Sequence, residues 1–378
     1  MSIYLDNAAT SYPKPEEVYQ AVMNAMREVG ASPGRGGHRR SLEAGRIVFQ
    51  AREAAAALFC APDSSRFIFT HSATESLNMA LRGTLLPGDH VITTSMEHNS
   101  LARPLHLLQR QGVELTVVQA GPDGRVDPVN IRRVLTPRTR MIAVGHVSNV
   151  SGTIQPIEAL SAIAREAGAL FLLDAAQSAG CVPIDVIGSG IDLMAVPGHK
   201  GLYGPQGTGL LYVAPHVALR PLLTGGTGTN STSEEQPVTM PEGFEAGTHN
   251  LPGIAGLKAG IEFVMKQGVA AIADHERALV CAARERLQAL AGVTLYGPSD
   301  PVLRAAVLSF TIAGKDSSWV AFELDQRFDI AVRAGLHCAP RAHRTLGTFP
   351  GGTVRVSPGW FTSLEDIAML VNAVEKCL

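Results

Sequence analysis

The chain has 378 residues, of which 46% are hydrophobic and 17% are charged, and its formal net charge is −2 at pH 7. A chain of this length is too long for one small hydrophobic core, so we expect one large domain and one smaller domain. The near-neutral charge gives no electrostatic reason to expect nucleic acid or an anionic membrane as a partner, and no apolar run approaches the roughly 20 residues that span a bilayer.

The chain begins with MSIYLDNAAT, which lacks the basic start and the apolar stretch of a secretory leader. Its five cysteines are odd in number, scattered and without CxxC spacing. This pattern argues against a disulfide framework and against a structural zinc site. We therefore expect a reduced, cytoplasmic setting and no bound metal.

Short apolar runs alternate with helical patterns between about residues 65 and 215. The runs that we expect to be strands are residues 66–70, 90–95, 141–147, 169–175 and 191–196. Helices are expected to begin near Thr74, Asn99 and Pro156. Nearly continuous apolar strands that alternate with helices predict an α/β fold, with a mostly parallel sheet covered on both faces.

The pattern changes after residue 225. Residues 225–250 form a long, polar, glycine-rich stretch without periodicity, and such a stretch in a compact protein is usually functional or disordered. Helical patterns then run from about 253 to 291, and the remaining strands and helices are typical of a small α+β domain. We expect a large domain over residues 15–255 and a small domain made of residues 1–14 and 256–378.

Polar residues follow several of these strands, at the edge where parallel sheets bind ligands. Residues 72–75 have the spacing of a capping box, and a helix start that includes Thr74 also presents free N–H groups suited to a phosphate. Asp174 ends a very apolar strand, where its carboxylate needs a partner such as a cationic ring nitrogen, or else caps the next turn. His98 and Asn149 follow two other strands, and each could also be an ordinary loop residue.

Lys200 lies in the segment AVPGHKGLYGPQGTG, between two apolar runs. It is either filler in a surface turn or an amine held beside a group that needs it. A lysine amine in a dry site has a lowered pKa and can form a Schiff base with an aldehyde. Pyridoxal phosphate needs such a lysine, an anion-binding helix start, an acid for its ring nitrogen and a flat group against its ring. Lys200, Thr74, Asp174 and His98 meet these four needs, so we expect this cofactor.

Cys338 lies in the segment VRAGLHCAP, five residues after Arg333 and directly after His337. These two neighbours could favour its thiolate, whereas the other four cysteines are expected to be inert, buried, small hydrophobic residues. Arg355 lies in the strand-like run TVRVS, where an arginine needs an anion. A substrate carboxylate would be a good bidentate partner, and a structural ion pair is the alternative.

Nine segments together make the chain similar to class V aminotransferase-fold enzymes, and specifically to the cysteine desulfurase and selenocysteine lyase group. They occur in the family's order over nearly the whole length: YLDNAAT, SATES, MEHNS, VSNVSGT, LDAAQSAG, GHKGLYGPQGTG, FEAGTHN, RAGLHCAP and TVRVSPGWF. The resemblance implies the PLP-dependent transferase fold (aminotransferase type I fold), with a large domain around a mostly parallel sheet and a small α+β C-terminal domain.

The resemblance also implies a role for each site residue. Lys200 would carry pyridoxal phosphate, Asp174 would pair with its ring nitrogen, and His98 would stack on its ring. Further contacts with the phosphate or with the ring oxygen are implied for Ala73, Thr74, Asn149, Gln177, His199 and Thr248. Cys338 would be the nucleophile, and the implied substrate contacts are Arg355, Asn149, Arg333, Arg35 and His38.

The implied activity takes sulfur from L-cysteine as a persulfide on Cys338 and releases L-alanine, with L-selenocysteine as an alternative substrate. The implied assembly is a homodimer with shared sites, in which Thr248 reaches the phosphate of the neighbouring subunit, and a protein could accept the persulfide. Relatives often carry a phosphate-binding serine where this chain has Pro197, which has neither a hydroxyl nor an N–H group. The phosphate would therefore rely on Thr74, His199 and Thr248.

Two other classes of function stay open. The chain could catalyse another reaction on the same fold, as an aminotransferase, a kynureninase-like hydrolase, an epimerase or a C–S lyase, but these reactions need no thiol at Cys338. It could also be an inactive scaffold for sulfur transfer, a reading that the presence of Lys200 and Asp174 disfavours.

Overall fold

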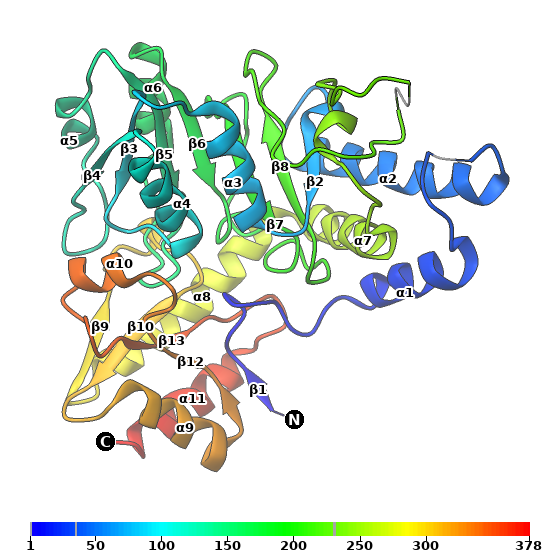
Figure 1. The fold of residues 1–378 in the computed structure, drawn as a ribbon. Coiled ribbons are helices and arrows are strands. Elements are labelled where there is room, and N and C mark those ends of the chain that lie inside the picture. The colour runs from blue at the N-terminus through cyan, green and yellow to red at the C-terminus, as the bar shows by residue number, and fades with distance from the viewer. Residues whose placement is uncertain (1, 35, 230–231) are drawn as a thin grey trace.

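The structure is a computed structural model that describes residues 2–34, 36–229 and 232–378 (Figure 1). In these residues the strands form sheets of seven, four and two strands. The seven-stranded sheet lies in the upper part of Figure 1, and the four-stranded sheet of the C-terminal region lies below it.

The seven-stranded sheet has the order β2-β8-β7-β6-β5-β3-β4. Its strands are β2 (Phe67–Thr70), β3 (His90–Thr94), β4 (Glu114–Val118), β5 (Thr139–Gly145), β6 (Leu170–Asp174), β7 (Leu193–Pro197) and β8 (Gly209–Val213). The strands from β7 to β4 are parallel, whereas β8 is antiparallel to both β7 and β2. The predicted mostly parallel sheet is confirmed.

Helices cover this sheet because its central strands are apolar on both faces. Every residue of β3, β6, β7 and β8 is buried. The helices between the strands are α3 (Ala73–Thr84), α4 (Asn99–Arg110), α5 (Pro128–Arg133) and α6 (Ile157–Glu166). Strands that are buried on both faces have this continuous apolar character, which distinguishes them from strands with one wet face.

The register of the parallel strands brings three loops to one edge of the sheet. Gly145 at the end of β5 pairs with Asp174 at the end of β6, and Asp174 pairs with Ala195 in β7. Consequently the segments that follow β5, β6 and β7 leave the sheet next to one another. This edge is where parallel sheets place their ligands.

The C-terminal region has its own sheet and its own core. Strands β9 (Val293–Tyr296), β10 (Leu308–Ile312), β12 (Arg333–Gly335) and β13 (Thr353–Val356) form an antiparallel sheet in the order β12-β13-β10-β9. It packs with α8 (Val269–Gln288), α9 (Ser317–Phe328) and α11 (Leu364–Glu375), and the short helix α10 (Pro340–Thr345) follows β12. The run 330–335 is divided into β11 (Ile330–Ala331) and β12, which belong to different sheets.

The N-terminus joins this second core. Strand β1 (Ile3–Tyr4) pairs in parallel with β11, and Ile3 and Leu5 are buried in the C-terminal hydrophobic cluster. The division into a large domain over residues 15–255 and a small domain of residues 1–14 and 256–378 stays a prediction.

The remaining helices lie at the right of Figure 1, where α1 (Glu16–Asn24) and α2 (Arg39–Leu58) pack on α7 (Leu251–Gln267). A π-helical turn continues α1 over Ala25–Val29. Short 3-10 turns occur at Ser64–Arg66, Glu242–Phe244 and Pro301–Leu303, and the second of these is the one helical segment in the described part of the long stretch 225–250.

Candidate active site

A cavity of about 260 Å³ lies at the edge where β5, β6 and β7 end. It gathers residues from segments far apart in the chain. The predicted site residues in its lining are Ala73, Thr74, His98, Asn149, Asp174, Gln177, His199, Lys200, Arg333 and Arg355.

Lys200 lies just after β7 and presents its amine to this cavity. Burial lowers the pKa of this amine to about 8, and the carboxylate of Asp174 opposes part of that effect. An amine with this pKa is partly neutral near physiological pH, so it can act as a nucleophile or accept a proton. The reading of Lys200 as filler in an exposed turn is therefore wrong.

The turn around Lys200 packs closely on the loop that follows Asp174. A Cβ atom on Gly201 would lie 2.4 Å from the carbonyl oxygen of Ala179 and 2.6 Å from Sγ of Cys181. A Cβ atom on Gly180, whose φ is +84°, would lie 2.2 Å from the carbonyl oxygen of Gly201. Only glycine allows such an approach of two backbones, so these glycines hold the segments that carry Lys200 and Asp174 together.

Asp174 is buried at the end of β6 and accepts a 3.0 Å hydrogen bond from the amide of Ala176. Burial raises the pKa of its carboxyl, whereas the Ala176 amide, Lys200 and Ser100 lower it. A buried carboxylate beside a cavity is stabilised by a cation placed in that cavity. The site can therefore hold a ligand with a protonated ring nitrogen.

His98 is the first residue before α4 and carries a neutral ring. Its Nδ1 accepts a 3.0 Å hydrogen bond from the amide of Ser100 and lies 2.8 Å from Oγ of the same residue. Burial, followed by the positive charges of Lys200 and Arg333, lowers the pKa of His98 to about 4. An uncharged, flat ring in the cavity wall can stack on a ligand ring.

One end of the cavity is built for an anion. Ser72, Ala73 and Thr74 line it at the start of α3, where the first amides of the helix have no partners within the helix. His199 also lines this cavity, and burial lowers its pKa to about 4. The Nδ1 atom of His199 is buried and has no hydrogen-bond partner among the described residues.

The predicted capping box at this helix start is only half correct. Ser72 Oγ accepts a 3.2 Å hydrogen bond from the amide of Glu75, as the spacing predicts. The carboxylate of Glu75 does not return to Ser72 but accepts hydrogen bonds from the amide of His71 at 2.6 Å and pairs with its ring at 2.9 Å. The carboxylate of Glu75 therefore accepts from the amide of His71, one residue before the Ser72 amide that a complete capping box would satisfy.

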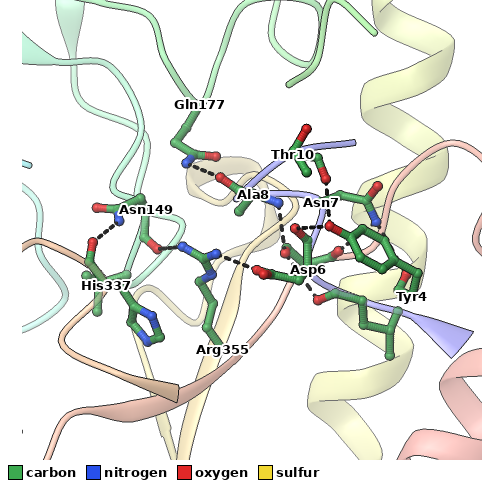
Figure 2. A network of polar contacts seen from close by, with 12 residues as sticks. Tyr4, Asp6, Asn7, Ala8, Thr10, Asn149, Gln177, His337 and Arg355 are labelled. Carbon is green, nitrogen blue, oxygen red and sulfur yellow. Dashed lines mark hydrogen bonds and ion pairs between the residues drawn. The ribbon is translucent and has the colours of Figure 1, made fainter. Parts of the chain in front are cut away.

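A polar network joins the N-terminal segment to the opposite side of the cavity (Figure 2). The Nη2 atom of Arg355 lies 2.6 Å from Oδ1 of Asp6, and its Nη1 donates a 3.2 Å hydrogen bond to the carbonyl oxygen of Asn149. The Nδ2 atom of Asn149 donates to the carbonyl oxygen of His337 at 2.7 Å, and Nε2 of Gln177 donates to that of Ala8 at 2.9 Å. The structural ion pair expected as the alternative for Arg355 is therefore present.

Arg333 and Arg355 face each other across two neighbouring strands. They are directly paired in the antiparallel ladder of β12 and β13, and both line the cavity. Like charges at directly opposed positions are unfavourable, and Asp6 makes an ion pair with only one of the two. Arg355 is 2% exposed, and its Nε has no partner among the described residues. A carboxylate in the cavity would compensate this excess of positive charge.

Cys338 is exposed and lies on the loop between β12 and α10, outside the lining of the cavity. His337 and Cys338 have φ angles of +47° and +57°, a strained conformation for residues with side chains. The carbonyl oxygen of Cys338 accepts a 2.8 Å hydrogen bond from the amide of Asn99, directly after His98. Burial and nearby arginines hold the pKa of His337 well below its usual range, so this neutral ring cannot favour the thiolate by its charge.

Three further predicted residues lie elsewhere or outside the described chain. Thr248 is exposed and lines a different hollow, next to His71, within the described chain. His38 is exposed and caps α2, where its Nδ1 accepts a 3.3 Å hydrogen bond from the amide of Ser41. Arg35 lies outside the described residues. Cys60, expected to be buried, is exposed.

Sequence reasoning missed several residues in the cavity wall, above all Glu97. This carboxyl is 2% exposed, accepts hydrogen bonds from Oγ1 of Thr94 at 2.5 Å and from the amide of Gly145 at 2.8 Å, and has a pKa raised to about 8 by burial. It directly precedes His98, so the strand-end rule could have found it. The other missed lining residues are Ala8, Ala9, Met96, Ser100, Gly145, Val147, Ser148, Gln155 and Ala176, whereas Ser72, Pro197 and His337, considered above but not predicted as site residues, also line the cavity.

No helix of the described residues combines the length and the apolar character that a membrane crossing requires. No group of three or more histidine, cysteine, aspartate or glutamate side chains in the same residues is placed to hold a metal ion.

Comparisons with known proteins place the chain in a family. The family model of aminotransferase class-V matches residues 3–370. A probable cysteine desulfurase from Methanothermobacter thermautotrophicus is 37% identical over 99% of this chain and 94% of that protein. A cysteine desulfurase from Pectobacterium atrosepticum is 34% identical over 99% of this chain and 92% of that protein.

Solved structures give the same result. The apo structure of a cysteine desulfurase from Thermococcus onnurineus NA1 has a TM-score of 0.93 and 35% identity, over 100% of this chain and 94% of that one. A cysteine desulfurase from Escherichia coli has a TM-score of 0.90 and 31% identity, over 99% of this chain and 94% of that one. The chain belongs to the aminotransferase class-V family and is a relative of its cysteine desulfurases.

Proposed function

We propose that this protein is a pyridoxal phosphate-dependent cysteine desulfurase. The observation that carries the proposal is that one cavity joins the amine of Lys200, the buried carboxylate of Asp174 and the neutral ring of His98. The names of the relatives support the reaction, because the relatives described above match over more than nine tenths of their own length and are named cysteine desulfurase or probable cysteine desulfurase.

The residues present fit pyridoxal phosphate. Lys200 would bind its aldehyde carbon, and Asp174 would accept a hydrogen bond from its ring nitrogen. The unpartnered Nδ1 of His199 and the start of α3 with Thr74 would hold its phosphate. Pro197 lines the same cavity without a donor, so the helix start supplies a larger share of these contacts. Gln177 would bind the ring oxygen after giving up its bond to Ala8.

The bound cofactor supplies an electron-accepting ring that stabilises negative charge on the substrate carbon. The protein has to remove the Cα proton of the substrate, and Nζ of Lys200 is suited to this task because burial lowers its pKa to about 8. The neutral imidazole of His98 would cover the ring without adding a charge to the site.

Arg355 and Arg333 would bind the carboxylate of cysteine. Both guanidinium groups line the cavity on paired strands, and Arg355 is held by Asp6 on one side. An arginine and a carboxylate form short, charge-assisted hydrogen bonds in a fixed orientation. Asn149, which bonds to both Arg355 and His337, would keep this side of the site in place.

Cys338 would accept the sulfur atom. In the balanced reaction, L-cysteine and the thiol of Cys338 give L-alanine and a persulfide on Cys338, because the Cβ–S bond breaks while an S–S bond forms. The exposed position of Cys338 allows a protein or a small thiol to remove the outer sulfur afterwards. The loop that carries Cys338 would have to bring its Sγ to the cavity.

We also propose a homodimer in a reduced compartment such as the cytoplasm. Thr248 is exposed on its own chain and lies outside the cavity, as expected of a residue that serves the neighbouring site. The five cysteines are free in the structure, which agrees with a reducing environment.

The central test compares the wild type with Lys200→Ala and with the control Lys258→Ala, a lysine whose partner is Glu262 on α7. The wild type and the control should absorb visible light and release alanine from cysteine. Borohydride should fix the cofactor to Lys200, and Lys200→Ala should show neither the covalent link nor alanine release. Labelling of another lysine would overturn the assignment.

A further inference from the structure

The backbone carbonyl of His199, directly before Lys200, receives an unusual number of hydrogen bonds from the N-terminal segment 10–14. The amide of Ser11 and Oγ1 of Thr10 both donate to it at 3.1 Å, and Nζ of Lys14 donates to it at 2.8 Å. The hydroxyl of Ser11 reaches the same oxygen at 3.3 Å and the carbonyl oxygen of Lys200 at 2.9 Å.

Lys14 stands out in this set because it brings a charge. Its Nζ donates to the hydroxyl of Ser11 at 2.8 Å in addition to the carbonyl of His199. Lys14 takes part in none of the ion pairs between described residues, and burial lowers its pKa to about 8. Holding an ammonium group out of water costs free energy. A lysine that only kept the surface polar would stay in the solvent.

The geometry links this contact to the chemistry. Because the peptide bond is planar, fixing the carbonyl oxygen of residue 199 also fixes the amide nitrogen of Lys200 and restricts its Cα. Further bonds hold the same turn, since the amide of Gly204 donates to the carbonyl of Gly198 at 2.7 Å and that of Tyr203 to the carbonyl of Lys200 at 2.9 Å. Segment 10–14 therefore holds the peptide from which the Lys200 side chain starts.

We propose that Lys14 is a positioning residue for Lys200, acting through the carbonyl oxygen of His199. This inference rests on the proposed function, because it assigns Lys14 a part in placing the reactive amine. The ammonium group makes a charge-assisted hydrogen bond, which is stronger than the neutral bonds from Thr10 and Ser11. This bond keeps the peptide between residues 199 and 200 in one orientation.

A purely structural role is the competing explanation. In that case Lys14 would only tie the N-terminal segment to the body of the protein, and its loss would lower stability without changing the reactivity of Lys200. The two explanations make different predictions for kcat and for the rate at which Lys200 is displaced from the cofactor. They also differ in what they predict for the variant Lys14→Arg.

The experiment uses the holoenzyme and the variants Lys14→Met, Lys14→Arg and Lys258→Met. Methionine keeps the unbranched apolar stem without a donor, arginine keeps a cationic donor, and Lys258→Met removes a lysine that contacts Glu262 instead. Two quantities are measured: steady-state alanine release from cysteine, and the rate at which hydroxylamine displaces Lys200 from the cofactor, followed by visible absorbance without substrate.

For Lys14→Met we expect kcat to fall by about 10- to 100-fold, as a small misplacement of a reacting group can do, with KM within about twofold of the wild type. The displacement by hydroxylamine should be clearly faster, because the lysine is held less firmly. Lys14→Arg should restore most of both properties, and Lys258→Met should match the wild type.

An unchanged kcat and displacement rate in Lys14→Met would overturn the proposal. So would a Lys14→Arg variant that folds but behaves like Lys14→Met, since a loss of packing would then explain the effect. If Lys14→Met does not fold, Lys14→Gln, whose neutral amide can still donate, replaces it in the comparison with Lys14→Arg. A wild type without visible absorbance or alanine release would instead refute the proposed function.

Discussion

The Asp6 carboxylate lies 2.6 Å from Nη2 of Arg355, and this pair connects residues that are 349 positions apart in the chain. Asp6 lies two residues after the end of β1, whereas Arg355 lies within β13. Because Arg355 is 2% exposed, its charge depends on this partner. The ion pair thus holds the N-terminal segment, and with it the positions of Ala8 and Lys14, against the C-terminal sheet.

Removing the carboxylate should be costly. We expect Asp6→Asn to lower the free energy of unfolding by about 2–4 kcal/mol, because a buried guanidinium then loses its counter-charge. The control is Glu166→Gln, which removes the exposed partner of Arg132 and should change the free energy of unfolding far less, because solvent screens an exposed pair. Urea unfolding of the holoenzyme measures both, and equal effects would contradict the importance of the buried pair.

Glu276 should make stability depend on pH. This buried carboxyl of α8 faces the thiol of Cys181, and burial raises its pKa from 4.5 to about 8. Between these two values the folded chain keeps a proton that the unfolded chain has released, so this group makes stability fall as the pH rises from 4.5 to about 8.

Glu276→Gln should abolish this contribution. The free energy of unfolding of the variant, minus that of the wild type, should increase over the same pH range by several kcal/mol and level off above it. Denaturant titrations at a series of pH values measure the difference. The subtraction removes the effects of other shifted groups, such as Glu97 and the histidines with lowered pKa values. A difference that does not vary with pH would show that Glu276 is ionised in the folded chain.

The proposed shared site can be tested by mixing subunits. Lys200→Ala and Thr248→Ala each damage both sites of a homodimer if Thr248 serves the neighbouring subunit. In a mixed dimer both lesions fall into one site, and the other site is intact. After random exchange about a quarter of the wild-type activity should return. No recovery, despite exchange demonstrated by mass spectrometry, would place Thr248 in the site of its own chain.

Cys338 can be compared with a matched control. Cys60 is also exposed and has the same left-handed φ of +57°, but it lies at the end of α2. We expect Cys338→Ala to lower the turnover of cysteine by at least about 100-fold, or roughly 3 kcal/mol in the barrier. Cys60→Ala should leave it unchanged.

The same variant distinguishes two substrates. Selenium leaves carbon more readily than sulfur, so Cys338→Ala should keep much of its turnover of selenocysteine. Release of alanine and of sulfide or selenide measures both reactions. Near-normal turnover of cysteine by Cys338→Ala would rule out the persulfide route and favour a C–S lyase.

Local patterns were sufficient to predict much of this protein. Apolar runs such as 169–175 predicted buried parallel strands, because only a strand covered on both faces lacks a polar side. The strand-end rule then identified Asp174, His98 and Asn149 as neighbours in space, since the carboxyl ends of parallel strands meet at one edge. Nine segments in the family's order, the one around Lys200 among them, identified the family, which the comparisons confirmed.

The sequence by itself therefore determined the fold class and the sheet edge that carries the cavity, because these follow from local periodicity, and its motifs supplied ten of the 23 residues that line the cavity. Tertiary structure alone decided which distant groups meet. Asp6 pairs with Arg355, Lys14 holds the carbonyl of His199, and Glu276 is buried beside Cys181. Each contact joins segments far apart in the chain, and no local pattern encodes it. The burial that shifts the pKa values of Lys14, Lys200 and Glu276 likewise arises only when separate elements pack and exclude water.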